Sequence, residues 1–217
     1  MYIPGVFKTD ETTAWAFVAE RAFGVVIGSR SGLPVAAHVP FVVSPPAEDR
    51  RLAFHVARAN PLHDILADNP QALIIVSGPD AYISPDWYVS VDQVPTWNYV
   101  SVHLTGTIRV IEQGDIRQHV DDLSAQFEDR LSGKKPWTSD KMTAAKRDAM
   151  LRAIVALEFS VQAIEAQWKL GQHKSAADQA NVLRMLESCG DRSSLALAEV
   201  IERRRDQAAL QSEGNGQ

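Results

Sequence analysis

Cysteine is almost absent from the sequence, because Cys189 is the only one in 217 residues. A single thiol excludes an intramolecular disulfide framework and any site built from several cysteine ligands. Long apolar runs are missing too, and the start Met1 to Gly5 lacks a charged region followed by an apolar one. We therefore expect a soluble, cytoplasmic protein with no membrane segment.

An excess of positive charge is also lacking. The chain has 22 Lys and Arg against 27 Asp and Glu, a formal net charge of -5, so it has no general attraction for a phosphate backbone. The arginines at 203–205 are interspersed with Glu199, Glu202 and Asp206, which is typical of a solvated helix. Direct DNA binding is therefore not expected.

Glycine-rich nucleotide motifs are missing as well. Gly24, Gly28 and Gly32 are spaced by four, which does not match G-x-G-x-x-G, and Gly133-Lys134 has Glu128 where a P-loop needs glycine. The run from Gly28 to Gly32 has arginine at its centre, not the serine of a hydrolase elbow. These spacings disfavour Rossmann, P-loop and serine hydrolase functions.

Metal-binding pairs are not evident among the six histidines. No two of them are four residues apart and none has a cysteine nearby, so the sequence predicts no metal site.

The elements that the sequence does contain are those of an α+β protein. Periodicity and turn residues predict helices and strands in this order: a helix over 10–22, a hairpin over 23–43, a polar turn at 45–51, a third antiparallel strand over 52–56, a helix over 62–68, strands over 72–77 and 99–112, and helices over 113–130 and 144–155. The first three strands are expected to form a meander.

The last third of the chain is predicted to return to the sheet and then become helical. Residues 157–170 fit either a strand or a helix, and we favour a strand. Helices are expected over 176–187 and 194–210, followed by a polar, frayed tail from Gln211.

The most unusual stretch runs from Gly78 to Gly106, where five aromatic residues crowd together with three prolines. Proline fixes its own φ and keeps the preceding residue out of helical geometry, so the rings are held on an extended or turning backbone. Such a surface suits a flat, partly polar ligand or a partner subunit. The equally weighted alternative is a set of core plugs at a barrel end.

A second candidate group follows the strand at 52–56. His38 and His55 lie in strands expected to be neighbours, and the sequence from His55 to Pro61 combines an imidazole, the Arg58 guanidinium and the Asn60 amide. Together with the amides that open the next helix, these groups could hold a phosphate. A capping and salt-bridge cluster is the alternative, and it has about equal weight.

Several rare strings in the same order resemble the PaiB-like FMN-binding negative transcriptional regulators, bacterial proteins related to flavin split barrels of pyridoxamine-phosphate-oxidase type. The resemblance is carried by Met-Tyr-Ile-Pro at the start, the strings over 32–41, 55–61, 78–88 and 94–99, and Trp-Lys-Leu at 168–170.

The resemblance implies an antiparallel split β-barrel of roughly six strands with peripheral helices. It would form a homodimer that binds FMN in clefts at the subunit interface. The domain organisation expected is an FMN-binding domain over 1–170, C-terminal helices over 171–210 packed on the barrel, and a flexible tail over 211–217. The implied cofactor-binding residues are these: His38, His55, Arg58, Asn60, Tyr82, Ser84, Trp97, Tyr99 and Lys169.

Three positions depart from the family pattern. Gly171 and His173 stand around Gln172 where the family has serine and asparagine, and Phe54 precedes the strand histidine where glycine is usual. These departures touch the expected surroundings of the cofactor and therefore bear on FMN affinity.

Three functions remain open at this point. The first is a dimeric FMN-binding negative transcriptional regulator, the second an FMN-dependent oxidoreductase acting on a small substrate, and the third a cofactor-free dimeric interaction module. The catalytic residues of an enzyme are not predicted, because the flavin itself carries out the redox chemistry.

Overall fold

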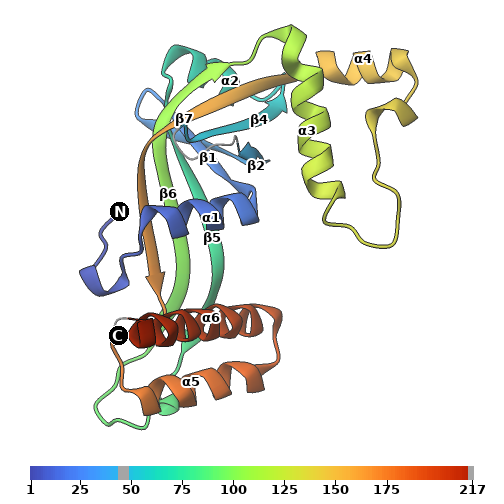
Figure 1. Cartoon of the computed structure of the whole chain (residues 1–217). Helices are drawn as coiled ribbons and strands as arrows, with labels where there is room; N and C mark the ends of the chain where they lie inside the picture. The colour runs from blue at the N-terminus through green and yellow to red at the C-terminus, as the bar shows by residue number, and fades with distance from the viewer. Residues whose placement is uncertain (44–48, 215–217) are drawn as a thin grey trace. The chain divides into compact units, whose positions relative to one another are not determined.

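The computed structural model describes residues 1–43 and 49–214, and side chains up to Asp206 (Figure 1). The predicted polar turn at 45–51 therefore lies largely outside the described residues. The helices are α1 (Glu11–Arg21), α2 (Leu62–Asp68), α3 (Ile116–Glu128), α4 (Ala144–Arg152), α5 (Ala176–Cys189) and α6 (Arg192–Gly214), and 3-10 turns lie at Gly5–Phe7, Pro85–Trp87, Gln113–Asp115 and Ser139–Lys141. The strands are β1 (Phe23–Arg30), β2 (Leu33–Pro40), β3 (Val42–Val43), β4 (Arg51–Ala57), β5 (Gln71–Ile83), β6 (Thr96–Val110) and β7 (Ile154–Lys169).

The seven strands form one open sheet in the order β2-β1-β5-β6-β7-β4-β3. The predicted first hairpin is confirmed: β1 and β2 pair antiparallel from Phe23 opposite Pro40 to Arg30 opposite Leu33. Its two turn residues, Ser31 and Gly32, both have positive φ, as a tight hairpin turn requires. The strand favoured over 157–170 is confirmed as β7.

The expected meander is wrong. A meander would place β4 beside the hairpin of β1 and β2. Instead β4 pairs antiparallel with β3 and β7, and the strand beside the hairpin is β5, which pairs with β1. Consequently His38 on β2 and His55 on β4 do not lie on hydrogen-bonded neighbours. Strand pairing is a long-range choice, and local periodicity does not encode it.

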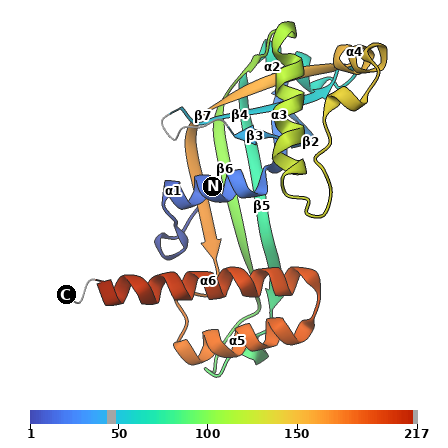
Figure 2. The same cartoon turned by 45° about the vertical axis from the view of Figure 1, so that its right-hand side comes forward.

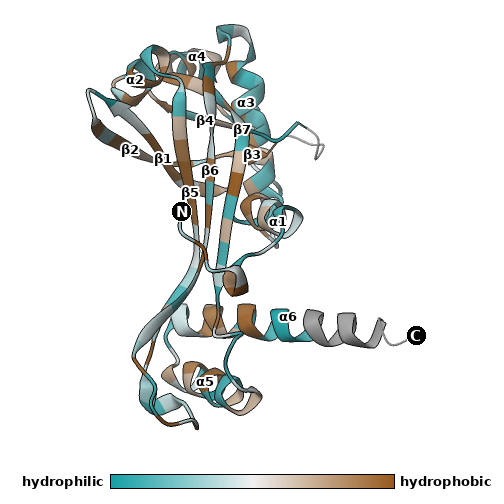
Figure 3. Ribbon diagram, turned by 90° about the vertical axis from the view of Figure 1, so that its left-hand side faces the viewer, coloured by the Kyte–Doolittle hydropathy of each residue, from teal (hydrophilic) through white to brown (hydrophobic). Residues whose placement is uncertain are grey.

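Alternation along the strands separates the core from the outer face of the sheet. In β4, Leu52, Phe54 and Val56 are buried, while the residues between them are only half-buried. Figure 3 shows hydrophobic residues along β1, β5 and β6. β6 and β7 approach closely at Gly106, where an added Cβ would lie 2.0 Å from the Ser160 carbonyl oxygen.

Contacts divide the chain into two compact units. The sheet unit comprises Glu11–Val76 and Val102–Glu165, and the helical unit comprises Met1–Asp10, Ser77–Ser101 and Ala166–Gln217. β5, β6 and β7 contribute residues to both units. The domain boundary predicted after Leu170 stays a prediction.

Within the helical unit, α5 and α6 lie side by side (Figures 1 and 2). α5 ends at Gly190 in the left-handed conformation, which is usual for a helix C-terminus. The apolar side chains Val182, Leu186, Leu197 and Ile201 are buried, so the two helices bury their apolar faces. α6 extends beyond the predicted end at 210 to Gly214.

Within the described part of the chain, the helices are all too short or too polar to cross a membrane.

Candidate functional site

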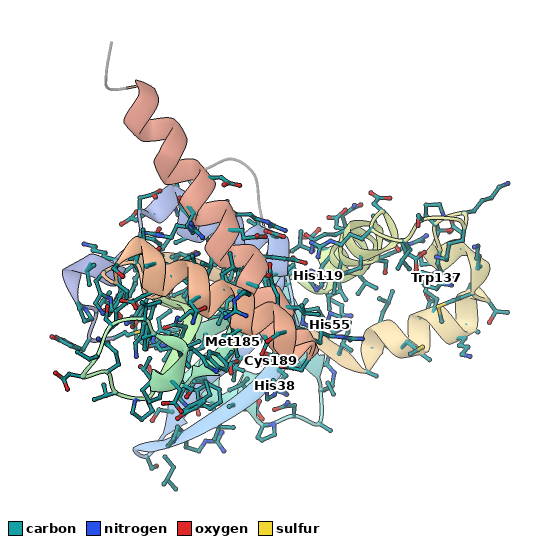
Figure 4. All side chains as sticks on the ribbon, turned by 90° about the horizontal axis from the view of Figure 1, so that it is seen from below. His38, His55, His119, Trp137, Met185 and Cys189 are labelled. Atoms are coloured by element: carbon teal, nitrogen blue, oxygen red, sulfur yellow. The ribbon has the colours of Figure 1, made fainter. Side chains whose placement is uncertain are left out.

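The first candidate group lies in the sheet unit and is centred on a pair of histidines. His55 lies opposite Ala156 of β7 in register, and α3 contributes His119, which is 6% exposed. The Nδ1 atom of His55 is 3.1 Å from Nε2 of His119, and the two rings meet edge to face at 78°. Figure 4 shows the two labelled histidines close together.

Burial lowers the pKa of both imidazoles. The pKa of His119 falls to about 4, first because the ring is desolvated and second because His55 is adjacent; the pKa of His55 is lowered by burial alone. Two neutral rings can share one N–H between the facing nitrogens, whereas two protonated rings would direct two N–H groups at each other. The pair is therefore neutral at pH 7. Among the described residues, His119 Nδ1 has no hydrogen-bond partner.

Arg58 is exposed, and its guanidinium is anchored on the backbone that joins α4 to β7. Nε donates to the Arg152 carbonyl at 2.9 Å and Nη2 donates to the Ile154 carbonyl at 3.0 Å. The remaining nitrogen, Nη1, makes no hydrogen bond to the described residues. An oriented guanidinium with free N–H groups can bind a phosphate, and the same bonds also cap the carbonyl end of α4.

Asn60 acts as a cap rather than as a free ligand. Its Oδ1 atom accepts a hydrogen bond from the Leu62 amide at 3.0 Å, as predicted for a residue that opens a helix. α2 is only seven residues long, and one of its first amides is occupied by this cap. The expected contribution of that helix terminus to anion binding is therefore small.

His38 lies apart from this group. It is exposed on β2, and its ring stacks on Phe23 with centroids 6.4 Å apart. The structure thus places Arg58 and Asn60 at the end of β4 and pairs His55 with His119, but it does not pair His38 with any of them.

The second candidate group lies in the helical unit and contains the predicted aromatic surface. Tyr82 and Trp97 are 47% and 54% exposed, and their rings meet edge to face with centroids 6.2 Å apart. Trp87, Tyr88 and Tyr99 are half-buried. The surface is therefore made by two of the five rings, and the other three pack partly inside.

Tyr99 and Lys169 of the same unit lie near each other, and each makes a polar contact of its own. The Tyr99 hydroxyl donates to Oε1 of the buried Gln167 at 3.1 Å. Lys169 Nζ donates to the Thr96 hydroxyl at 2.7 Å and lies 5.9 Å from the Tyr99 ring centroid. This arrangement offers a half-buried cation beside an aromatic ring.

The backbone that carries these aromatics is fixed by α5. Asp178 is buried and accepts hydrogen bonds from the amides of Val89 and Ser90 at 2.8 and 2.9 Å. It also accepts from the hydroxyls of Ser90 and Ser175. The bonds from Ser90 contribute most to lowering the pKa of this carboxyl well below its usual range. Ser84 in turn accepts from the Asp86 amide at 3.3 Å, so it caps a 3-10 turn.

Sequence reasoning missed three residues that support these groups: Asp178, Gln167 and His119. The Ser175-x-x-Asp178 spacing is typical of a capping box and could have indicated the first. His119 shares a helical stripe with Ile116 and Leu123, which predicts burial. Gln167 stands between two other buried residues of β7, Ala166 and Trp168, and the sequence gives no comparable signal for it.

The three departures from the family pattern have structural explanations. Gly171 has a φ of +75°, a conformation that favours glycine, and Phe54 is fully buried in the core. His173 packs edge to face on Phe7 with centroids 5.4 Å apart. In the described residues, these three positions contribute packing and turn geometry.

Comparison with known proteins identifies the family. A family model described as "Putative FMN-binding domain" matches residues 1–163. The chain is 31% identical over 203 residues to the Bacillus subtilis protein PAI 2, a protease synthase and sporulation protein, covering 93% of this chain and 97% of that protein. A yeast protein, YKL070W, is 26% identical over 159 residues, covering 63% of this chain and 93% of its own length.

Solved structures agree in fold. The FAD and haem binding protein of Mycobacterium smegmatis matches with a TM-score of 0.55 and 20% identity, covering 79% of this chain and 77% of that one. The flavocytochrome Anf3 of Azotobacter vinelandii matches with a TM-score of 0.52 and 19% identity, covering 81% and 75%. These likenesses confirm the predicted split-barrel fold with a helical C-terminal part, in an open antiparallel sheet of seven strands. The chain therefore belongs to the family of FMN-binding domains, as a protein of PaiB type with FMN as the family's cofactor.

Proposed function

We propose that this protein is a homodimeric, FMN-binding negative transcriptional regulator of PaiB type. The match to PAI 2 spans nearly the whole of both chains, which supports a shared role, and regulation is the role that the resemblance to the PaiB-like family implies. The observation that carries the proposal is the exposed ring pair of Tyr82 and Trp97, since large exposed aromatic surfaces mark ligand or partner contacts.

Each of the two candidate groups, taken by itself, has chemistry that suits a part of FMN. Arg58 presents an anchored guanidinium with free N–H groups, which suits a phosphate. Tyr82 and Trp97 present exposed rings, which suit a flat heterocycle. Lys169 would supply a second cation, and Ser84 and Tyr99 would supply polar contacts. His55 and Asn60 already bond to His119 and to the Leu62 amide, so they are retained as contacts on the resemblance alone. His38 is retained as a contact on the resemblance alone.

A homodimer is supported by exposed apolar residues between Tyr82 and Trp97. Val89, Val91 and Val94 are 66%, 82% and 71% exposed, although Asp178 holds the backbone in place at Val89 and Ser90. An ordered segment with this much exposed apolar surface is typical of an interface. We therefore propose that the segment over 82–97 contacts the partner subunit.

Regulation need not involve direct reading of DNA by this chain. The arginine-rich part of α6 pairs Arg203 with Glu199 at 3.7 Å. Glu202 and Asp206 flank the arginines at 203–205 in the sequence, so acidic residues match the arginines in number. We propose that the flavin, or its redox state, is the signal to which the protein responds. FMN, when bound, supplies one- and two-electron redox chemistry.

The proposal is tested by purifying the protein and measuring flavin absorption, oligomeric state and promoter binding at low salt, with and without FMN. Flavin uptake by a dimer is expected. A protein that takes up no FMN would favour the cofactor-free interaction module. Reduction of bound FMN by NADH or NADPH, with turnover on an acceptor, would favour the oxidoreductase instead.

A further inference from the structure

A cavity of about 200 Å³ lies in the sheet unit, under α4 and beside α3. Its walls come from α3, from the segment over 137–142, from α4 and from the adjacent ends of β4 and β7. Figure 4 labels two of its lining residues, His55 and Trp137. Apart from His55, none of the residues that line it is among those proposed to contact FMN.

Most of the cavity wall is apolar. Half-buried apolar residues line it: Val120, Trp137, Met142, Leu151 and Ile154. α4 has nine residues and no buried residue. A helix this short is marginal without tertiary packing, so an apolar molecule in the cavity would provide packing that α4 lacks.

The polar groups of the wall select the kind of molecule. Arg147 Nε is buried without a hydrogen-bond partner among the described residues, and the nearest carboxylate to its guanidinium, Asp140, is 3.8 Å away. A buried N–H group without an acceptor is costly. Arg117 is paired with Asp121 at 3.5 Å and with Asp140 at 3.1 Å, so its charge is balanced. In the described part of the chain, Arg147 has only the longer contact to Asp140, and this weakly paired guanidinium is the group of the wall that suits an anion.

The volume limits the size of that anion. A dry apolar cavity of about 150 Å³ holds benzene, so about 200 Å³ suits one ring with a small substituent. Sites for larger, drug-sized ligands occupy roughly 300–1,000 Å³, so a tricyclic flavin would not fit.

We propose that this cavity binds a small monocyclic aromatic carboxylate. The ring lies against Trp137, Met142 and Leu151, and the carboxylate accepts a hydrogen bond from the Arg147 guanidinium. This binding does not require FMN. A negative result with the aromatic carboxylate would therefore leave the proposed function untouched, and a failure of the proposed function would leave this proposal untouched.

Calorimetric titration of the full-length protein tests the proposal with three probes: benzoate, benzyl alcohol and acetate. Benzoate is expected to bind saturably, benzyl alcohol more weakly, and acetate not at all. Arg147→Met should weaken benzoate binding by about ten-fold or more and leave benzyl alcohol binding nearly unchanged. The matched control Lys146→Met, an exposed cation on the same helix, should leave both unchanged.

A second variant locates the ring. Leu151→Trp fills the cavity and should abolish binding of both aromatic probes, and a tryptophan fluorescence change on adding benzoate should disappear in Trp137→Phe. Two results would overturn the proposal: no saturable heat with millimolar benzoate, or equal benzoate affinity in the wild type and in Leu151→Trp.

Discussion

His55 of β4 and His119 of α3 share one short contact, 3.1 Å between Nδ1 and Nε2, in an environment that keeps both rings neutral. The contact joins the sheet to α3 through two residues that are 64 positions apart in the sequence. Its strength must depend on pH, because protonation of both rings destroys it.

Acid should therefore destabilise the protein through His119. The folded-state pKa is about 4, below the ordinary value of 6.5, so the unfolded chain binds the proton more readily. The stability contribution is fully present above pH 6.5 and is lost as the pH falls from 6.5 to about 4. The loss is about 3 kcal/mol as an upper estimate. Urea unfolding from pH 8 to 4 should show a flatter profile for His119→Gln, and identical profiles would contradict this account.

Arg58 has two interpretations that a single variant separates. Arg58→Ala should weaken FMN binding by about ten-fold or more if the guanidinium contacts the phosphate. It should also lower the melting temperature slightly, because two carbonyls near the end of α4 lose their donor. Arg109→Ala, another exposed arginine of the sheet unit, is the control. Lower stability with unchanged FMN affinity would assign Arg58 to capping alone.

The exposed Trp97 ring is expected to contribute to the dimer. Trp97→Ala should raise the dimer dissociation constant by about ten-fold or more, since buried tryptophans dominate interface energies. Tyr2→Ala removes another exposed aromatic of the same unit, 88% exposed, and should have no effect. Analytical ultracentrifugation measures both, and a Trp97→Ala protein that dimerises like the wild type would place the interface elsewhere.

Much of the fold could be predicted from the sequence, because local signals dominate within each element. The hairpin at Ser31-Gly32 and the strand over 157–170 are examples. The sheet order could not be predicted, because the residues at 52–56 carry no local signal for the strand they pair with. That strand, β7, lies about a hundred residues later in the chain. β5 also continues through Gly78 and Pro79 to Ile83, where proline and glycine had indicated an end.

The candidate site was less predictable than the fold. Residue types at 55–60 indicated a group of side chains that binds phosphate. In the structure, however, His55 is hydrogen-bonded to His119 and Asn60 accepts a hydrogen bond from the Leu62 amide. Such partners are set by tertiary packing, which periodicity does not reveal. The nine predicted cofactor contacts therefore stay predictions until variants are measured.

Asp178 should determine how rigid the segment over 88–90 is. In Asp178→Asn the carboxylate charge is lost and one acceptor oxygen becomes an NH₂ donor, so the amides of Val89 and Ser90 lose charge-assisted bonds. Hydrogen exchange at these two amides should become roughly ten-fold faster or more. Asp86→Asn, an exposed carboxylate nearby, should leave exchange unchanged. Equal protection in Asp178→Asn would show that the loop is fixed by other contacts.

Gly106 should tolerate no side chain. A Cβ there would meet the Ser160 carbonyl oxygen at 2.0 Å, so Gly106→Ala must push β6 and β7 apart and should cost about 1–3 kcal/mol or more. Gly114→Ala, where no heavy atom lies within 4 Å of an added Cβ, should change stability by about 0.5 kcal/mol at most. Urea unfolding compares them, and equal stability would contradict the close approach of these strands.

FMN binding by this chain is measured by the visible absorption of the purified protein before and after addition of FMN and removal of the excess. We expect the protein to keep a flavin spectrum after the excess FMN is removed. We also expect its melting temperature to be higher with FMN than without it, because a ligand that binds the native state stabilises that state. A colourless protein with an unchanged melting temperature would contradict FMN binding.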